Sequence, residues 1–546
     1  RRWNRRVRLC LPISMAIIAL LVILTISYEQ TIHAYPGGGG AYIVARDNLG
    51  EFPAQLAGAA LLTDYILTVS VSVASGVAQM TSAYPSLFPY RVVLSIGLVL
   101  FMMLVNLRGV RESGMAFAVP TYFFIVMLFL TVGSGLGQVL MGSFGTVENP
   151  PPLEIVPSMP SITLFLLLHA FSSGTTAVTG VEAISNGVPA FKEPRSRNAG
   201  ITLIWMAAIL GALFLVISFL ALRVGAIPSE AETVISQLVR TIYGGRGLMY
   251  LATIGATTLI LIMAANTSFA DFPRLSALAA ADGFLPRQLT YRGSRLVFSR
   301  GIVALALIAS LLIWLFQASV TALIPLYAIG VFLSFTLSQA GMAHRWWKVG
   351  HLAPGQEVQE RGSTLRREPR WVMKMVINGF GAFCTAVVTL VFAATKFREG
   401  AWIVILLVPL LVVMFSAIHY HYRTLAARLS LEQYGAPGRI SRQRVILPIS
   451  GVHRGTLAAL RYARTLSDDI TAVHICMDEA EVESVRRKWE SWGDGVRLVV
   501  LDSPYRLLVE PLLGYIEQIA AQRQPNEIIT IIVPQFVPRR WWHNFL

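Results

Sequence analysis

The sequence predicts an α-helical polytopic membrane protein followed by a C-terminal α/β domain. First, 55% of the 546 residues are hydrophobic and only 14% are charged, which lies outside the usual balance of soluble domains. Second, eleven apolar spans are long enough to cross a bilayer. Third, strand and helix patterns alternate after residue 417. The net charge of +15 fits basic loops on one side of a membrane, so it does not indicate a nucleic acid polymer as partner.

The eleven predicted spans share high hydropathy and little charge. They cover residues 9–27, 56–83, 90–106, 118–140, 161–185, 200–222, 247–269, 301–317, 321–343, 376–395 and 401–419. Alternate loops differ in charge, with about 18 Lys and Arg side chains in one set and about five in the other. We therefore predict that the basic set is cytoplasmic. The C-terminus then also lies in the cytoplasm, and membrane lipid of the cell (plasma) membrane surrounds the spans.

The first residues do not fit that orientation. An odd number of spans puts the N-terminus outside, although five of the first eight residues are arginine and the charge rule disfavours them there. We therefore expect at least one helix before Arg1. The alternative is a cytoplasmic N-terminus with one of the spans re-entrant.

The span 56–83 carries a carboxylate, Asp64, roughly 12 Å of helical rise inside the bilayer. An unpaired carboxylate at that depth costs roughly 3 kcal/mol or more, so it must face a polar interior. Thr68 and Ser72 follow at one-turn intervals, which puts two hydroxyls on the same helix face. This pattern predicts a path for a cation or a proton. The alternative is one buried Asp bonded to a neighbouring helix, with the hydroxyls bonded to their own backbone.

The span 161–185 is poorly suited to one continuous helix, because glycines interrupt it among Ser and Thr. Broken helices are where transporters bind their ions. Thr179 and Glu182 are three residues apart, so the hydroxyl and the carboxylate can face one site. The alternative places Glu182 at the cytoplasmic interface, solvated near Lys192 and Arg195.

Four consecutive glycines lie in the loop AYPGGGGAYIVARDNLG, residues 34–50. Such a run disfavours regular helix and permits hinge motion or close backbone approach. No GxxxxGK[ST] pattern follows, so a phosphate-binding loop is disfavoured. We predict a conformational joint beside the transport path.

Five motifs together resemble the Kup/KimA-type potassium–proton symporter family, within the amino acid–polyamine–organocation (APC) superfamily. They are LLTDYILTVSVSVASG, AYPGGGGAYIVARDNLGE, NLRGVRESG, TGVEAISNGVPAFKEP and NTSFADFPRLSALAAADGFLPRQL. The resemblance implies the inverted-repeat transporter fold of LeuT/APC type, with twelve helices of which the first and sixth are unwound at mid-membrane. Eleven spans are present, and the first of them corresponds to the second helix of the family.

The resemblance also implies a cation site, proton-coupled potassium uptake and a homodimer. The implied cation-binding residues are Asp64, Thr68, Ser72, Thr179, Glu182 and Tyr327. Potassium is a large, hard cation that is best served by carboxylate, hydroxyl and carbonyl oxygens. A carboxylate in mid-membrane can also exchange a proton, because burial disfavours its charged form. Tyr327 enters through the resemblance alone, since buried tyrosines in helix bundles mostly serve packing.

Residues 424–546 alternate strands with helices, which predicts βαβ units and a parallel sheet, separate from a transporter domain of residues 1–423. Ligands bind such sheets at the carboxyl ends of the strands, so the turn SGVHRGT after the first strand is the place for one. The domain resembles universal-stress-protein-like regulatory folds but has no glycine-rich phosphate loop after the last strand, which disfavours ATP. A purely structural dimerisation domain is the alternative.

For the ligand of this domain, the resemblance favours a cyclic dinucleotide that binds between two tails and inhibits flux. Basic side chains are available for an anion; they are His453, Arg454, Arg486, Arg487 and Lys488. The alternative is that these residues form an ordinary solvated face. No motif in the domain itself specifies the ligand.

No enzyme or cofactor is predicted, because GxSxG, HExxH and Walker patterns do not occur. Two further classes of function stay open beside potassium uptake. One is an amino-acid or other small-solute permease on the same fold. The other is a signalling or scaffold membrane protein whose tail performs the function.

Overall fold

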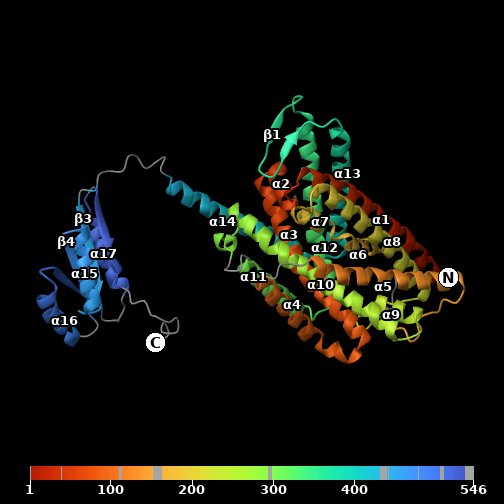
Figure 1. The fold of residues 1–546 in the computed structure, drawn as a ribbon, viewed down its shortest axis with the longest axis horizontal. Coiled ribbons are helices and arrows are strands. Elements are labelled where there is room, and N and C mark those ends of the chain that lie inside the picture. The colour runs from red at the N-terminus through yellow and green to blue at the C-terminus, as the bar shows by residue number, and fades with distance from the viewer. Residues whose placement is uncertain are drawn as a thin grey trace. The chain divides into compact units, whose positions relative to one another are not determined.

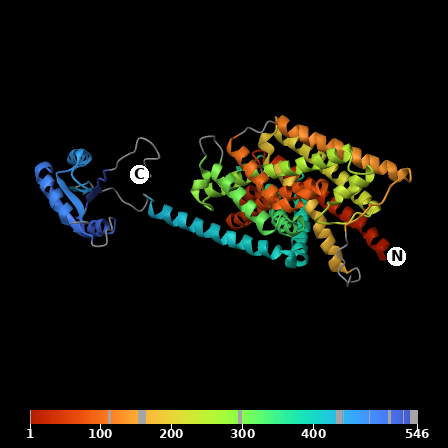
Figure 2. The same ribbon diagram turned by 90° about the horizontal axis from the view of Figure 1, so that it is seen from below.

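The computed structural model describes residues 2–38, 40–109, 114–151, 163–292, 298–430, 440, 442–476, 479–503, 509–524 and 526–534. The chain divides into two compact units, residues 1–426 and 427–546. The first unit is a bundle of helices with one small hairpin, and the second is a parallel sheet covered by helices (Figures 1 and 2). The predicted boundary after residue 423 falls inside the last helix of the first unit.

The first unit contains long helices with several shorter ones between them. The helices are α1 (Arg2–Ala34), α2 (Ala41–Leu49), α3 (Glu51–Ala83), α4 (Arg91–Leu107), α5 (Gly114–Leu140), α6 (Leu164–Thr175), α7 (Val181–Asn186), α8 (Arg195–Val224), α9 (Val234–Ile242), α10 (Leu248–Ala281), α11 (Ser299–Leu315), α12 (Val320–Gly350), α13 (Trp371–Thr395) and α14 (Ala401–Arg428). Strands β1 (Glu357–Gln359) and β2 (Thr364–Arg366) form an antiparallel hairpin between α12 and α13.

Each predicted span coincides with helical structure, which confirms a polytopic helical membrane protein. Among the described residues, ten spans are long and apolar enough to cross a membrane. The exception is α11, a shorter apolar helix of 17 residues at the predicted span 301–317. That length is at the lower end of what crosses a bilayer.

Helix α3 lies at the centre of the bundle and packs against α2, α10 and α12. In its most apolar window 72% of the residues are buried, against 17% in the span that contains α4. Small side chains allow the close approach: a Cβ at Gly330 of α12 would lie 3.0 Å from the carbonyl oxygen of Ala60 and 3.6 Å from Cβ of Asp64. Burial on all sides is what allows α3 to carry a carboxylate away from lipid.

The predicted interruption in the span 161–185 is present. Helix α6 ends at Thr175, a single 3₁₀ turn follows, and α7 starts at Val181. Thr179 is extended and Gly180 has φ +97°, a left-handed conformation that glycine adopts without strain. The backbone is therefore non-helical beside Thr179 and Glu182.

Within its described residues, the second unit has a four-stranded parallel sheet in the order β5-β4-β3-β6. Its elements are β3 (Arg442–Ile449), α15 (Arg454–Leu466), β4 (Asp469–Cys476), α16 (Glu479–Trp492), β5 (Arg497–Asp502), α17 (Val509–Ala521) and β6 (Glu527–Ile531). Strand β3 is central, and Val445, Ile446 and Leu447 are fully buried. This confirms the predicted alternation of strands and helices.

Candidate functional site

A polar cavity of about 60 Å³, which we call the membrane pocket, lies where α3, α10 and α12 meet the break between α6 and α7. Its lining contains Asp64, Tyr65, Thr68, Thr179, Gly180, Glu182, Ala183, Asn186, Thr267, Ser268, Asp271, Tyr327, Val331 and Phe335. Five of the six predicted cation-binding residues line it. Ser72 is not among the lining residues; it lies half-buried one turn beyond Thr68 on α3.

Asp64 and Thr68 form the α3 wall of the membrane pocket. The Thr68 hydroxyl donates to Oδ1 of Asp64 over 3.4 Å, as their spacing of one helical turn allows. Asp64 is only 8% exposed. A carboxylate buried to this degree needs partners for its charged form. The one hydroxyl donor found among the described residues leaves room for a bound cation or a proton.

Glu182 is buried as well, with 7% of its surface exposed, so it is not a solvated interface residue. The backbone N–H of Ala41, at the start of α2, donates to its Oε1 over 3.2 Å. The Ser334 hydroxyl of α12 donates to its Oε2 over 3.1 Å. The carboxyl group of Glu182 thus joins the broken helix, the glycine-rich joint and α12.

Sequence reasoning missed the contribution of α10 to the membrane pocket. Thr267, Ser268 and Asp271 line it from this helix, and Tyr65 and Asn186 complete the polar wall. Ser268 and Asp271 are three residues apart and share a helix face, but this spacing alone does not place that face beside α3. The motif that contains them served above only as evidence of family resemblance.

The charged side chains that line the membrane pocket, among the described residues, are all acidic. Three carboxyl groups line it, and no Lys, Arg or His is among the described lining residues. Hydroxyls, the non-helical backbone at Thr179 and the carboxyl groups offer the hard oxygens that alkali cations prefer. The cavity is far smaller than the 300–1,000 Å³ typical of sites for small organic molecules. An ion fits this geometry better than an organic solute.

On the side of the basic loops, α2 is fixed by an ionic cluster. Tyr42 donates to Oδ2 of Asp282, just after α10, over 2.7 Å, and Nη1 of Arg46 donates to the same oxygen over 2.9 Å. Burial and the hydrogen bond to Asp282 raise the pKa of Tyr42, so its hydroxyl stays protonated. The β1–β2 hairpin adds a bond from the Gly362 N–H to Asp47. Helix α2 is thereby attached to the glycine-rich joint at one end and to this cluster along its length.

In the second unit, a cavity of about 490 Å³, the tail pocket, opens at the carboxyl ends of β3 and β4. Ser450, His453 and Thr456 line it from the predicted turn. His474 is 3% exposed; its Nδ1 is 3.0 Å from the carbonyl oxygen of Ile449, so Nδ1 carries the proton. Its Nε2 is buried and has no hydrogen-bond partner among the described residues.

Of the five basic side chains that are available for an anion in the tail, only His453 lines the tail pocket. His453 caps the N-terminus of α15 there. Arg486, by contrast, lines a different cavity with Trp489, and neither Arg487 nor Lys488 is among the lining residues of the tail pocket. The part of these side chains in binding a ligand between two tails stays a prediction.

The bundle with a broken helix beside a polar pocket defines a transporter of the amino acid permease class, and residues 7–415 match the amino acid permease family. Residues 441–546 match the KimA potassium transporter C-terminal domain. The chain is 41% identical to the potassium transporter KimA of Bacillus subtilis (strain 168) over 538 residues, which is 98% of this chain and 85% of that protein. The chain therefore belongs to the KimA family of multi-pass membrane transporters.

Proposed function

We propose that the protein is a transporter that takes up potassium ions across the cell membrane. The observation that carries the proposal is the membrane pocket, where three carboxyl groups and several hydroxyls face an ion-sized cavity without a described basic side chain. The similarity to the potassium transporter KimA supports the same cation. The proposed ligands are Asp64, Thr68, Thr179, Glu182 and Tyr327. Ser72, implied by the family resemblance, is the weakest member because it lies outside the pocket lining.

Coupling to protons is the second part of the proposal. Asp64 and Glu182 line one small cavity, and two buried carboxylates strongly disfavour being charged together. In the proposed symport one of the two carboxyl groups carries the proton while the other stays charged and binds the cation, so the proton and the cation cross together. The sequence contains no Walker motif for ATP binding. We therefore propose that a proton gradient drives the uptake.

The test is uptake of radioactive rubidium, a potassium analogue, by potassium-starved cells that express the protein. We expect saturable rubidium uptake that potassium competes for and that a protonophore abolishes. Uptake of labelled amino acids instead would establish the permease function. No flux of either, together with ligand binding by the tail, would establish the signalling function.

We propose that the basic loops and the tail lie in the cytoplasm, as the charge rule favours. A cysteine-specific membrane-impermeant reagent tests this on a protein whose only cysteine is the natural Cys476 of β4, after replacement of Cys10 and Cys384. We expect labelling in inside-out vesicles under mildly denaturing conditions and none in right-side-out vesicles. The reverse pattern would place the tail outside.

For the tail we propose a homodimer in which a cyclic dinucleotide binds between the two tails, with the tail pocket contributing to its site, and inhibition of flux when it binds. The volume of the tail pocket is in the range of small-molecule sites. The N-terminus of α15 favours a phosphate, and the free Nε2 of His474 can accept a hydrogen bond from a base amine or a sugar hydroxyl. Ligand binding that favours one arrangement of two tails can bias the bundle.

Calorimetry with the purified protein tests the ligand. We expect heat with cyclic dinucleotides and a fall in rubidium uptake at the same concentrations. Clear heat with ATP or AMP and none with cyclic dinucleotides would contradict the choice of ligand. Deletion of the residues after Tyr422 should shift the detergent-solubilised protein toward monomer, and an unchanged dimeric mass would show that the tail does not hold the pair.

A further inference from the structure

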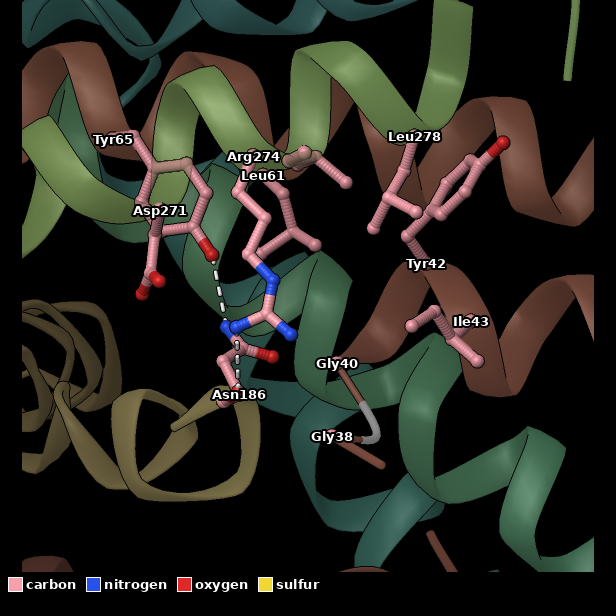
Figure 3. A pocket seen from close by; sticks show the side chains of 11 residues that line it. Gly38, Gly40, Tyr42, Ile43, Leu61, Tyr65, Asn186, Asp271, Arg274 and Leu278 are labelled. Carbon is pink, nitrogen blue, oxygen red and sulfur yellow. Dashed lines mark hydrogen bonds between the residues drawn. The ribbon is translucent and has the colours of Figure 1, made fainter. Parts of the chain in front are cut away.

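The membrane pocket is separated from a second cavity by a wall of three residues. The second cavity, of about 40 Å³, lies toward α2, and we call it the α2-side cavity. Tyr65, Asn186 and Asp271 line both cavities. Figure 3 shows the α2-side cavity with these three side chains at one end and Tyr42 and Ile43 of α2 at the other.

A single hydrogen bond closes the middle of this wall. Nδ2 of Asn186, the last residue of α7, donates to the hydroxyl of Tyr65 on α3 over 2.9 Å (Figure 3). The carbonyl oxygen of Asn186 accepts from Nη1 of Arg274 over 3.4 Å. Because α7 follows the helix break, rotation about that break would part Asn186 from Tyr65.

The glycine-rich joint supports Asn186 from the α2 side. A Cβ at Gly40 would lie 2.2 Å from Oδ1 of Asn186, and a Cβ at Gly38 would lie 3.0 Å from its carbonyl oxygen. Gly40 has φ −63°, which alanine adopts equally well. An alanine there would therefore displace the Asn186 side chain without straining the backbone.

Helix α10 supplies oxygens on both sides of the wall. Asp271 reaches both cavities, and Ser268, one turn earlier on the same face, lines the membrane pocket. Ser268 is 1% exposed, and its hydroxyl has no hydrogen-bond partner among the described residues. A buried hydroxyl without a partner in a cavity wall indicates a site that an ion or water completes.

We propose that the Tyr65–Asn186 hydrogen bond is the gate between the membrane pocket and the α2-side cavity, and that Asp271 binds the cation as it passes this gate. The inference rests on the proposed cation transport. Asp64 and Glu182 hold the cation while the gate is closed, and parting Asn186 from Tyr65 exposes it to the α2-side cavity. Asp271, which lines both cavities, then provides a carboxylate in the wall itself, so the cation keeps an oxygen partner as it crosses.

Loss of one neutral hydrogen bond shifts a two-state equilibrium by roughly fivefold, which sets the expected size of the effect. The reporter is Ser268→Cys, on the membrane-pocket side, in a protein whose three natural cysteines are replaced. We expect Tyr65→Phe and Gly40→Ala each to raise its labelling rate from the α2 side about fivefold. Labelling from the opposite side should not rise.

Gly37→Ala is the matched control, because no atom lies within 4 Å of a Cβ at that position. It should leave the labelling rate unchanged. Unchanged labelling in both Tyr65→Phe and Gly40→Ala, with melting temperatures like that of the unsubstituted protein, would overturn the gate. A lower melting temperature with faster labelling from both sides would also overturn it, because general loosening would then be the cause.

Asp271→Asn tests the exit carboxylate. We expect the maximal rate of rubidium uptake to fall about tenfold while rubidium binding to the purified protein changes less than twofold. Asp271→Glu should recover part of the rate. A loss of binding as large as that of Asp64→Asn would overturn the exit role and make Asp271 part of the main site. The labelling experiment needs no potassium flux, so the gate and the proposed transport function can fail separately.

Discussion

The membrane pocket and the tail pocket differ in volume and in the polarity of their lining residues. The membrane pocket is about 60 Å³ and is lined by carboxyl and hydroxyl groups from four separate chain segments. The tail pocket is about 490 Å³, mostly apolar, and has two histidines at its polar edge. In the functions proposed above, the first selects by charge and ion size, and the second by shape with few polar contacts. Charge removal should therefore be severe in the first pocket and mild in the second.

Asp64→Asn gives the largest expected effect. Loss of a charged ligand in a buried site costs about 3 kcal/mol, so rubidium uptake should fall roughly hundredfold. The measurement is initial uptake rate corrected for the amount of protein in the membrane. Glu148→Gln, which removes an exposed carboxylate, is the control and should transport normally. Normal uptake by Asp64→Asn would remove Asp64 from the mechanism.

Thr68→Val and Ser72→Ala test how far the cation site extends along α3. Thr68 lines the pocket and bonds Asp64, so its loss should raise the rubidium concentration for half-maximal uptake about tenfold. Ser72 lies outside the lining, and its substitution should change that concentration less than about twofold. Equal effects would extend the site along α3, as the family resemblance implies.

Variants of His474 test the expectation that polar substitutions in the tail pocket have mild effects. His474→Asn keeps a donor for the Ile449 carbonyl but removes Nε2, and His474→Gln keeps an amide near the position of Nε2. We expect His474→Asn to weaken cyclic dinucleotide binding about fivefold in calorimetry, and His474→Gln to weaken it less. Basal rubidium uptake should be unaffected in both. Equal binding by both variants would exclude a contact to Nε2.

Asp282→Asn gives the smallest expected effect. It weakens a half-buried ion pair with Arg46, for which about 0.5–1 kcal/mol is expected, so the melting temperature should fall slightly. Rubidium uptake should change about twofold, because α2 is held less firmly beside the transport path. The control is Glu193→Gln, in an exposed pair with Arg195. A tenfold change in uptake would make this cluster part of the transport machinery.

The site could be predicted from the sequence where its residues lie close together on one helix. Asp64 and Thr68 are one turn apart on a single helix, and the helix break follows from nearby glycines, so both could be predicted. Asp271 could not, because its place in the pocket depends on α3 and α10 packing together across some 200 residues of sequence. Ser72 shows the same limit of local patterns. Its spacing puts it on the helix face of Asp64 and Thr68, but the pocket ends before it.

In the tail, the strands and helices could be predicted because each has its own hydrophobic period. Which basic side chains lie beside the tail pocket could not be predicted, because that depends on where α16 lies relative to β3. Local patterns do not contain that information. His474 lies in the middle of an apolar strand pattern, where a histidine most often serves packing, so its free Nε2 had no signature.

The close crossing at Gly330 constrains how the bundle can move. Helices α3 and α12 touch there without intervening side chains, so sliding one past the other would force backbone into backbone. During transport the two helices should therefore move together as one rigid unit. Displacement should be confined to segments such as α7 and the glycine-rich joint. Spin labels on α3 and α12 should keep a single distance with and without rubidium, whereas labels on α3 and α7 should report two.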